Sequence, residues 1–426
     1  MNFLLYLTLL VLPLPLFHLI LKHKHYLYCL PPFMALIGIY LFNLIGSINV
    51  INDESLFSYK YYYSLLTIII FFYAFYIIVF SFGNKLYIDW STMQAQHSSG
   101  IVLFLIALWS YSFYMFFLYY KRHGLPPLFG ISLFQYTDIY ALRAEKTTSL
   151  PEGMYWYRMG LATIPSLIFI YTYVLKVLYG TRKYKFIFYI NLPLVLLSVS
   201  LTLSKSAYVY LLFHILLVNF LLKGGQFELK KLYGYISLGV ISMILMIRIY
   251  LWDRGFIDVL ELAPRFLFRR ICVVYTQAHA YIVQIFPDQH DYFDGLAFFP
   301  NPGSILPFEP VSISQFLGYW AHGVLQNYST PSFSQGYANF GFQGIILVVL
   351  LMFFQILLFQ IIFKECPKNP LFLALYIFLA EKMMRYAIEP IQSVIPEELI
   401  IFYLLIILLY YFLSSSNLIL RENKAV

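Results

Sequence analysis

A run of basic and polar residues recurs at helical spacing after Pro264. Its members are four, three, four and three residues apart, and they are Arg265, Arg269, Cys272, Thr276 and His279. This spacing predicts a helix with one basic-to-polar face, with Pro264 at its first position and Arg270 beside the stripe. Guanidinium groups can grip phosphate in bidentate fashion, so Arg265, Arg269 and Arg270 are candidates for holding a diphosphate, whose charges need more than one cation. The alternative is an amphipathic anchor in a membrane interface.

Two further cations are candidates for the same chemistry. Arg143 falls in a predicted helix at about 138–146, where the alternative role is a surface salt bridge with Glu145 or Glu152. Lys205 stands between two serines in the sequence Leu-Ser-Lys-Ser-Ala, where two predicted spans meet with almost no loop. Snorkelling would explain this lysine but not the two hydroxyls, so we expect Lys205 to meet a lipid-borne anion.

Ionisable residues toward the outer end of the predicted span at 371–388 form another candidate site. Arg385 and Glu389 are one helical turn apart there, and they either pair with each other or serve the reaction. Glu389 and His322 are the two candidates for a group that accepts a proton from a sugar hydroxyl. His322 has the alternative role of a structural or substrate-binding histidine.

Aromatic side chains close to amides and hydroxyls lie between positions 319 and 337. Tyr319, Trp320 and Tyr337 are the candidates for a surface on which sugar rings stack. Asn, Gln and Ser around them can bond sugar hydroxyls. The three cysteines form neither a disulfide framework nor a metal-binding pattern, and we expect no metal and no cofactor.

The composition identifies the solvent in which these side chains must be positioned. Of 426 residues, 61% are hydrophobic and only 11% are charged, which excludes an ordinary soluble domain. The net charge of +8 is scattered among apolar blocks, so it does not indicate nucleic-acid binding. We therefore predict an all-α polytopic membrane protein forming one integral-membrane domain over 1–426.

Hydrophobic runs long enough to cross a bilayer recur about eleven times. They lie near 3–21, 28–46, 64–83, 100–120, 160–179, 186–204, 206–223, 232–252, 342–363, 371–388 and 398–416. The first run lacks a basic start and a cleavage site, so we expect it to be retained as a helix. Lysines and arginines on alternate short connections mark the cytoplasmic side, which predicts a periplasmic N-terminus and a cytoplasmic C-terminus.

Two long loops then lie on the extracytoplasmic face, at about 121–159 and 253–341. Both are rich in arginine, tyrosine, histidine and acidic residues, whereas the cytoplasmic connections are short. Long loops of this kind usually carry function, so we expect the site on this face.

The layout as a whole resembles the bacterial O-antigen and oligosaccharide repeat-unit polymerases of the Wzy type. The resemblance covers most of the chain. It rests on the order of spans, the loop with Arg143, the joint at Lys205, the segment Pro-Arg-Phe-Leu-Phe-Arg-Arg, the sequence STPSFSQGYANFGFQG and the charged span EKMMRYAIEP. The family usually has arginine where Lys205 stands, so this chain keeps the charge there and loses the fork.

The resemblance implies a GT-C-like membrane glycosyltransferase of the bacterial inner membrane. It would transfer a growing glycan from undecaprenyl diphosphate to the non-reducing end of an incoming lipid-linked repeat unit on the periplasmic face. Its implied partners are that lipid-linked oligosaccharide, membrane lipids, a chain-length regulator and a flippase of the same pathway. Arg143, Lys205, Arg265, Arg269, Arg270 and Arg385 would neutralise the diphosphate.

Three alternatives remain at the level of sequence. An O-antigen ligase uses the same donor with a lipid A-core acceptor, and loss of a ligase would leave no repeat unit on the surface glycolipid. A repeat-unit flippase or other transporter would have internal repeats and short loops on both faces, which this chain does not have. A scaffold protein of polysaccharide assembly would make no glycan at all.

Overall fold

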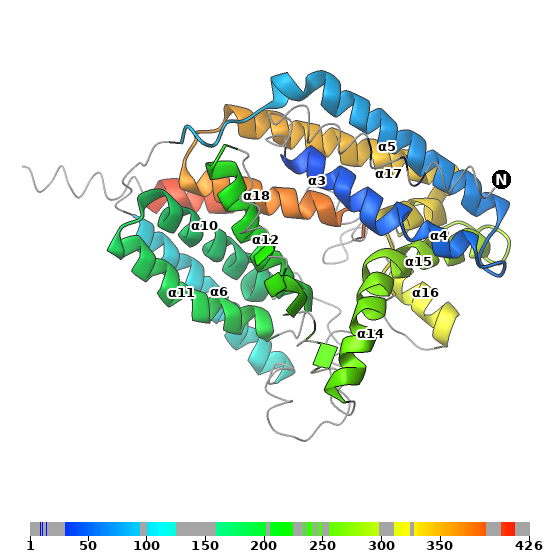
Figure 1. The fold of residues 1–426 in the computed structure, drawn as a ribbon, viewed down its shortest axis with the longest axis horizontal. Coiled ribbons are helices and arrows are strands. Elements are labelled where there is room, and N and C mark those ends of the chain that lie inside the picture. The colour runs from blue at the N-terminus through cyan, green and yellow to red at the C-terminus, as the bar shows by residue number, and fades with distance from the viewer. Residues whose placement is uncertain are drawn as a thin grey trace, which may run out of the picture. The chain divides into compact units, whose positions relative to one another are not determined.

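The computed structural model describes residues 30–93, 100–124, 159–201, 205–224, 255–297, 311–323, 328–388 and 402–413, with isolated positions between 9 and 14 and between 233 and 248. All regular structure within these residues is helical (Figure 1). Five of the described helices are long and apolar enough to cross a membrane, and they are Leu30–Ile51, Tyr59–Val79, Ile101–Lys121, Met159–Tyr179 and Ser332–Glu365. The prediction of an all-α membrane protein is confirmed at this level.

The chain divides into two compact units. The first comprises Met1–Ile88, Leu260–Cys366 and Leu379–Pro396, and the second comprises Asp89–Val259, Pro367–Phe378 and Glu397–Val426. Each unit gathers segments that are distant in sequence.

The first unit is built on two long helices that lie side by side, α5 (Tyr59–Leu86) and α17 (Ser332–Glu365) (Figure 1). The rings of Phe75 and Phe353 stack between them with centroids 4.0 Å apart. Ser58 caps α5 by accepting a hydrogen bond from the Tyr61 N–H group. The remaining elements are α3 (Leu30–Ile39), η2 (Tyr40–Leu44), α4 (Ser47–Ile51), most of α14 (Phe256–Phe268), η4 (Arg269–Val273), α15 (Val274–Ile285), α16 (Ile313–His322) and the end of α18 (Pro370–Arg385).

Helix α17 is two helices joined by a sharp reversal. Phe340 and Gly341 leave the helical region, and Gly341 has a φ of +61°, which favours glycine. A Cβ on Gly336 would lie 2.5 Å from the Gly344 carbonyl oxygen, so the two pieces fold back on each other. The second piece corresponds to the predicted span at 342–363, whereas the first, within the predicted loop, is buried.

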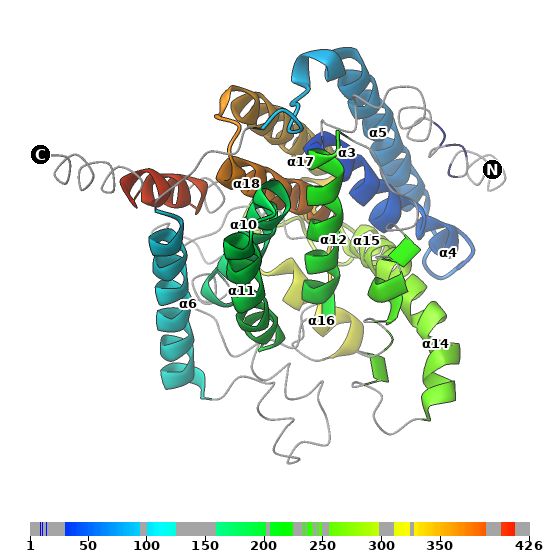
Figure 2. The same cartoon turned by 60° about the vertical axis from the view of Figure 1, so that its left-hand side comes forward.

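The second unit is organised around α10 (Ile164–Tyr179), which lies between α6 (Ile101–His123) and α12 (Lys205–Leu222) (Figure 2). Helix α10 follows η3 (Met159–Thr163) and ends at Gly180 in the left-handed conformation. The chain then turns directly into α11 (Arg182–Ser200), which packs along α10. The Tyr403 hydroxyl donates to the Leu375 carbonyl, which ties the helix at 402–413 to α18.

Helices occupy most of the other predicted spans in the described residues. The helices α11, α12, α18 and 402–413 coincide with the runs predicted at 186–204, 206–223, 371–388 and 398–416. The predicted span at 3–21 falls almost wholly outside the described residues. In the predicted span at 232–252 the described positions, which are 233, 234, 237–241, 244, 247 and 248, are helical.

Replacing Gly46 by alanine should destabilise the protein, because η2 and α4 approach η4 there without room for a side chain. A Cβ on Gly46 would lie 1.6 Å from the Cys272 carbonyl oxygen, although the Gly46 backbone itself is helical. We expect the free energy of unfolding to fall by about 1–3 kcal/mol or more, as in other overpacked cores. Gly234→Ala is the matched control, because nothing lies within 4 Å of its Cβ. Thermal unfolding in detergent measures both, and equal midpoints would contradict the close approach.

Candidate functional site

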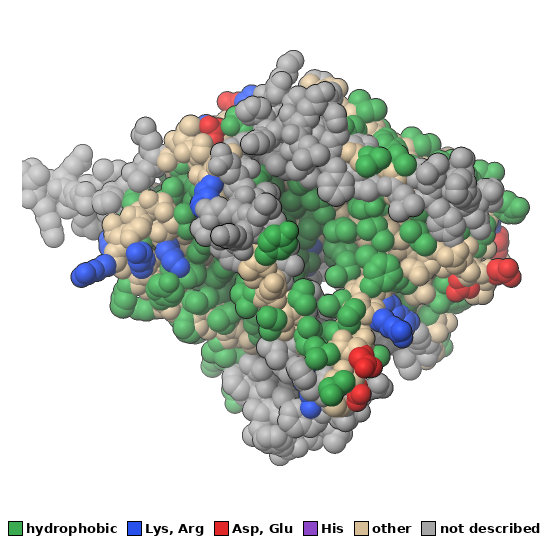
Figure 3. Space-filling view, viewed as in Figure 1, with side chains coloured by type: hydrophobic (Ala, Val, Ile, Leu, Met, Phe, Trp, Pro, Cys, Tyr) green, Lys and Arg blue, Asp and Glu red, His purple; other side chains and the backbone are tan. Residues whose placement is uncertain are grey.

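The basic segment predicted from the sequence lies where α14 passes through η4 into α15. Arg265 falls in the last turn of α14, Arg269 and Arg270 begin η4, and all three side chains are exposed. Lys and Arg side chains gather at this end of α14 and acidic ones at the other (Figure 3). Asp258 in the first turn and Arg265 in the last both complement the helix dipole.

The predicted start of this helix was wrong. Helix α14 begins at Phe256, and Pro264 lies inside it, not at its first position. Proline has no N–H group, so one helical hydrogen bond is missing at this position. The Pro264 ring is exposed, so it points away from the packed core. The same helix exposes Ile257, Leu260 and Phe268 beside its charges, so the membrane-anchor role also fits its surface.

The predicted single basic-to-polar face was also wrong, because η4 interrupts it. In a π turn the hydrogen bonds reach five residues along the chain, so the side chains that follow are rotated relative to an α-helix. Arg265 and Arg269 are therefore exposed, whereas Cys272, Thr276 and His279 are buried in the first unit. The basic half of the stripe faces outward and the polar half joins the core.

An aromatic cluster includes a tyrosine on which two of the arginines act electrostatically. The Tyr281 ring centroid is 5.7 Å from that of Trp320 and 6.4 Å from that of Tyr328. Burial raises the pKa of Tyr328, as does Tyr281, while the charges of Arg269 and Arg270 act in the opposite direction because they favour the phenolate. Both arginines are thus close enough to act on Tyr328. We refer to Arg269, Arg270, Tyr281, Trp320 and Tyr328 as the arginine–aromatic patch.

The three predicted glycan-binding residues have different surroundings. Trp320 is 41% exposed within the arginine–aromatic patch, and Tyr319 beside it is also exposed. Tyr337 is only 1% exposed, and its ring packs edge-on against His279 at a centroid distance of 6.4 Å. It therefore cannot offer a face to a sugar in this conformation, and its role here is packing. Burial of the first piece of α17 is the physical reason.

Arg385 forms an ion pair with Glu381 in the preceding turn of α18. Their nearest atoms, Nη1 and Oε1, are 2.9 Å apart, and the Glu381 side chain is only 4% exposed. The predicted partner Glu389 lies outside the described residues. The chain just after Arg385 is held by Ser332, which donates to the Tyr386 carbonyl, and by Asn43, which donates to the Ala387 carbonyl.

A buried histidine joins three helices at the centre of the first unit. The His279 Nε2 atom lies 2.5 Å from the Ser64 hydroxyl on α5, and its Nδ1 atom lies 3.0 Å from the Ser334 hydroxyl on α17. Burial lowers the pKa of His279 to about 3, so its ring is neutral at pH 7. One ring nitrogen then donates and the other accepts. Sequence reasoning missed this arrangement because the serines are 215 and 55 residues away.

The other predicted site residues are placed less completely. Arg143 lies outside the described residues, as Glu389 does. Lys205 begins α12 in the second unit and His322 ends α16 in the first, and the side chains of both fall outside the described part of the chain.

Removing one partner of the Glu381–Arg385 pair should cost more than neutralising both. Arg385→Ala removes the positive partner of the buried Glu381 carboxylate, so we expect the free energy of unfolding to fall by about 3–5 kcal/mol. The double variant Glu381→Gln/Arg385→Gln keeps the volume and removes both charges, so its loss should be smaller. Chemical denaturation of the purified variants measures the difference. A larger loss in the double variant would contradict the pairing.

The neutral, buried His279 should make stability depend on pH. Its folded pKa is below the unfolded value of about 6.5, so the unfolded chain binds the proton more readily. Stability should therefore be full above that value and fall as the pH drops toward about 3. His279→Gln should flatten this dependence, as measured by thermal unfolding across the range. The exposed His290→Gln is the control, and equal slopes in the two variants would contradict the prediction.

Comparison with known proteins gives no match from which a function could be inferred. The chain matches no protein-family model, no curated protein and no solved structure. A function is therefore argued from its own residues.

Proposed function

We propose that the protein is an integral-membrane glycosyltransferase that polymerises lipid-linked oligosaccharide repeat units. The growing glycan would leave undecaprenyl diphosphate and join the non-reducing end of an incoming repeat unit at the periplasmic face of a bacterial inner membrane. The product would be an O-antigen, capsule or exopolysaccharide.

The observation that carries this proposal is the arginine–aromatic patch. The charges of two exposed guanidinium groups act on Tyr328, which belongs to an aromatic cluster with Tyr281 and Trp320, in a chain whose long helices are apolar. A substrate that joins a diphosphate to a sugar needs both kinds of group, cations for the phosphates and ring faces for the glycan. A lipid-borne substrate also requires that the site belong to a membrane protein.

The reaction needs a leaving group to be stabilised and a proton to be removed. A hydroxyl of the acceptor sugar attacks the anomeric carbon of the donor, and the bond from that carbon to the diphosphate oxygen breaks. Arg269 and Arg270 neutralise the charge that develops on the departing diphosphate, with Arg265 one turn away. Glu389 or His322 accepts the hydroxyl proton, and Arg143, Lys205 and Arg385 are further cations for the lipid diphosphates.

The finer topology is part of the proposal. It consists of about eleven spans in a GT-C-like arrangement, with the N-terminus in the periplasm and the C-terminus in the cytoplasm. In this arrangement α14, α15 and α16 belong to the second periplasmic loop. Accessibility labelling of single cysteines placed in that loop would test the orientation.

Reconstituted protein supplied with lipid-linked repeat units should make longer glycans without nucleotide sugar. Chain growth is resolved by gel electrophoresis of the labelled glycan. A parallel reaction with a lipid A-core acceptor separates polymerase from ligase, because only a ligase would label that acceptor. Absence of growth with either acceptor, in protein that retains its thermal unfolding transition, would overturn the proposal.

Substitutions in the patch sharpen this test. Arg269→Ala should slow chain growth by about a hundredfold or more, as expected on losing a group that stabilises a developing anion. Arg269→Lys keeps the positive charge but loses the planar pair of N–H donors, so its rate of chain growth should lie between those of the wild type and Arg269→Ala. Lys185→Ala, an exposed cation on α11, is the control and should leave growth unchanged. Wild-type growth in Arg269→Ala and Arg270→Ala would remove the patch from the reaction.

A further inference from the structure

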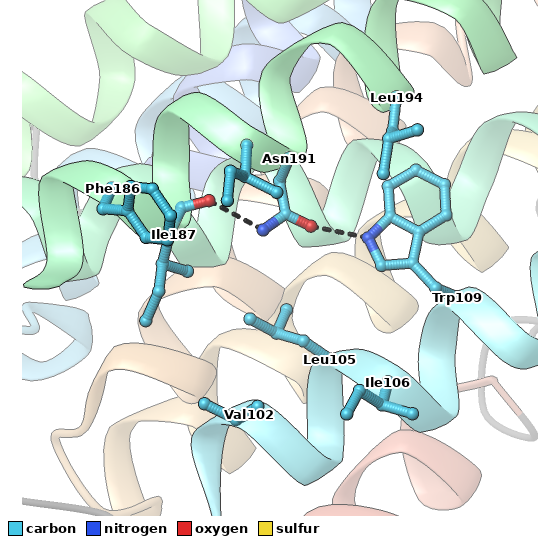
Figure 4. A pocket seen from close by; sticks show the side chains of 9 residues that line it. Val102, Leu105, Ile106, Trp109, Phe186, Ile187, Asn191 and Leu194 are labelled. Atoms are coloured by element: carbon cyan, nitrogen blue, oxygen red, sulfur yellow. Dashed lines mark hydrogen bonds between the residues drawn. The ribbon is translucent and has the colours of Figure 1, made fainter.

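The second unit has an open apolar groove between α6 and α11, with a volume of about 230 Å³ (Figure 4). Val102 and Ile106 line it from α6, and Phe186, Ile190 and Leu194 line it from α11. Its polar groups are already satisfied: the Trp109 indole N–H donates to the Asn191 side chain 2.5 Å away, and the Asn191 amide donates to the Ile187 carbonyl. The groove therefore offers a ligand mainly hydrocarbon, which suits part of an acyl chain.

Two exposed cations lie in the first turn of α11, before the residues that line the groove. Arg182 precedes Phe186 by four residues and Lys183 precedes Ile187 by four, so each lies one helical turn before a residue that lines the groove, Lys183 near the middle of the lining and Arg182 at its edge. Lys185 is also exposed, but the helical period places it on another face. Figure 3 shows Lys and Arg side chains gathered over α10 and α11.

The local backbone adds to this positive charge. The first turn of α11 contains no acidic residue, and the side chain of Thr181 makes no capping hydrogen bond. The N–H groups of that turn and the positive end of the helix dipole thus point toward the same region as the cations. Three basic residues at a helix N-terminus are unfavourable by themselves, and an anion bound there would relieve the repulsion.

We propose that the groove and the start of α11 form a binding site for one anionic phospholipid. The phosphate lies at Arg182, Lys183 and the N–H groups of the first turn of α11, and one acyl chain lies in the groove between α6 and α11. A zwitterionic lipid would bring its own ammonium group to these cations, and a water-soluble anion would leave the groove unused. The site uses no residue of the arginine–aromatic patch and stands whether or not the protein polymerises glycans.

Trp109, which lines the groove, supplies a direct probe. The full-length protein is placed in phosphatidylcholine bilayers that contain a minor fraction of phosphatidylglycerol brominated on its chains. The same fraction of brominated phosphatidylcholine is the comparison. Quenching of the Trp109 contribution, taken as the difference between the wild type and Trp109→Phe, should be stronger with the anionic lipid. Equal quenching by the two lipids would overturn the proposal.

Two matched variants test the role of charge. Arg182→Gln and Lys183→Gln should each weaken the preference for the anionic lipid by about fivefold, the contribution expected of one surface cation. Lys185→Gln removes the same charge from another face and should leave the preference close to wild type. An equal loss in Lys185→Gln would mean that only the general surface potential attracts the lipid.

Two further measurements exclude other occupants. Soluble glycerol phosphate should not restore the Trp109 fluorescence that brominated phosphatidylglycerol quenches, because it cannot fill the groove. If it displaced the lipid, the site would bind only the phosphate and the proposal would be wrong. Native mass spectrometry should find one retained phosphatidylglycerol for each chain. A doubled protein mass without lipid would show that a second copy of the chain covers the groove, and the proposal would be wrong.

Discussion

The first unit depends on the close approach of η2 and α4 to η4. Gly46 lies against the Cys272 carbonyl, and this contact fixes the turn whose first residues are Arg269 and Arg270. Asn43 of η2 bonds the Ala387 carbonyl, two residues beyond Arg385. A second glycine contact, Gly38 against the Met384 carbonyl, holds α3 to the end of α18. One apolar helical segment thus touches both arginine-bearing parts of the first unit.

Polar side chains inside this unit are arranged so that their bonds join helices. His279 links α5 and α17 through two serines, and Gln355 donates to the Tyr386 hydroxyl from the far piece of α17. Asn339 accepts from the N–H groups of Gly295 and Ala297, which holds the chain after α15 against α17. Such bonds matter in an apolar surrounding, because a buried polar group without a partner is costly there.

The helices could be predicted because their apolar runs are long, and length does not depend on tertiary contacts. The exposure of Arg265, Arg269 and Arg270 could be predicted from their charge. The inward position of Thr276 and His279 could not, because a π turn changes the phase of a helix without a clear mark in the sequence. The burial of Tyr337 was missed because segments far along the chain cover it. The pairing of Arg385 with Glu381 was missed because several charges nearby in sequence compete for the same arginine.

The reversal in α17 also determines how that helix fits a bilayer. A straight helix of its 34 residues would extend about 50 Å, far beyond the hydrocarbon layer of about 30 Å. The break at Phe340 and Gly341 leaves a straight piece of roughly 35 Å, close to the thickness of that layer. The other piece, Ser332 to Asn339, then needs no lipid contact of its own, because protein covers its hydroxyls and amides. The length of the second piece thus matches the hydrophobic thickness of a bilayer, and Gly341 at the break separates this piece from the first, which protein surrounds.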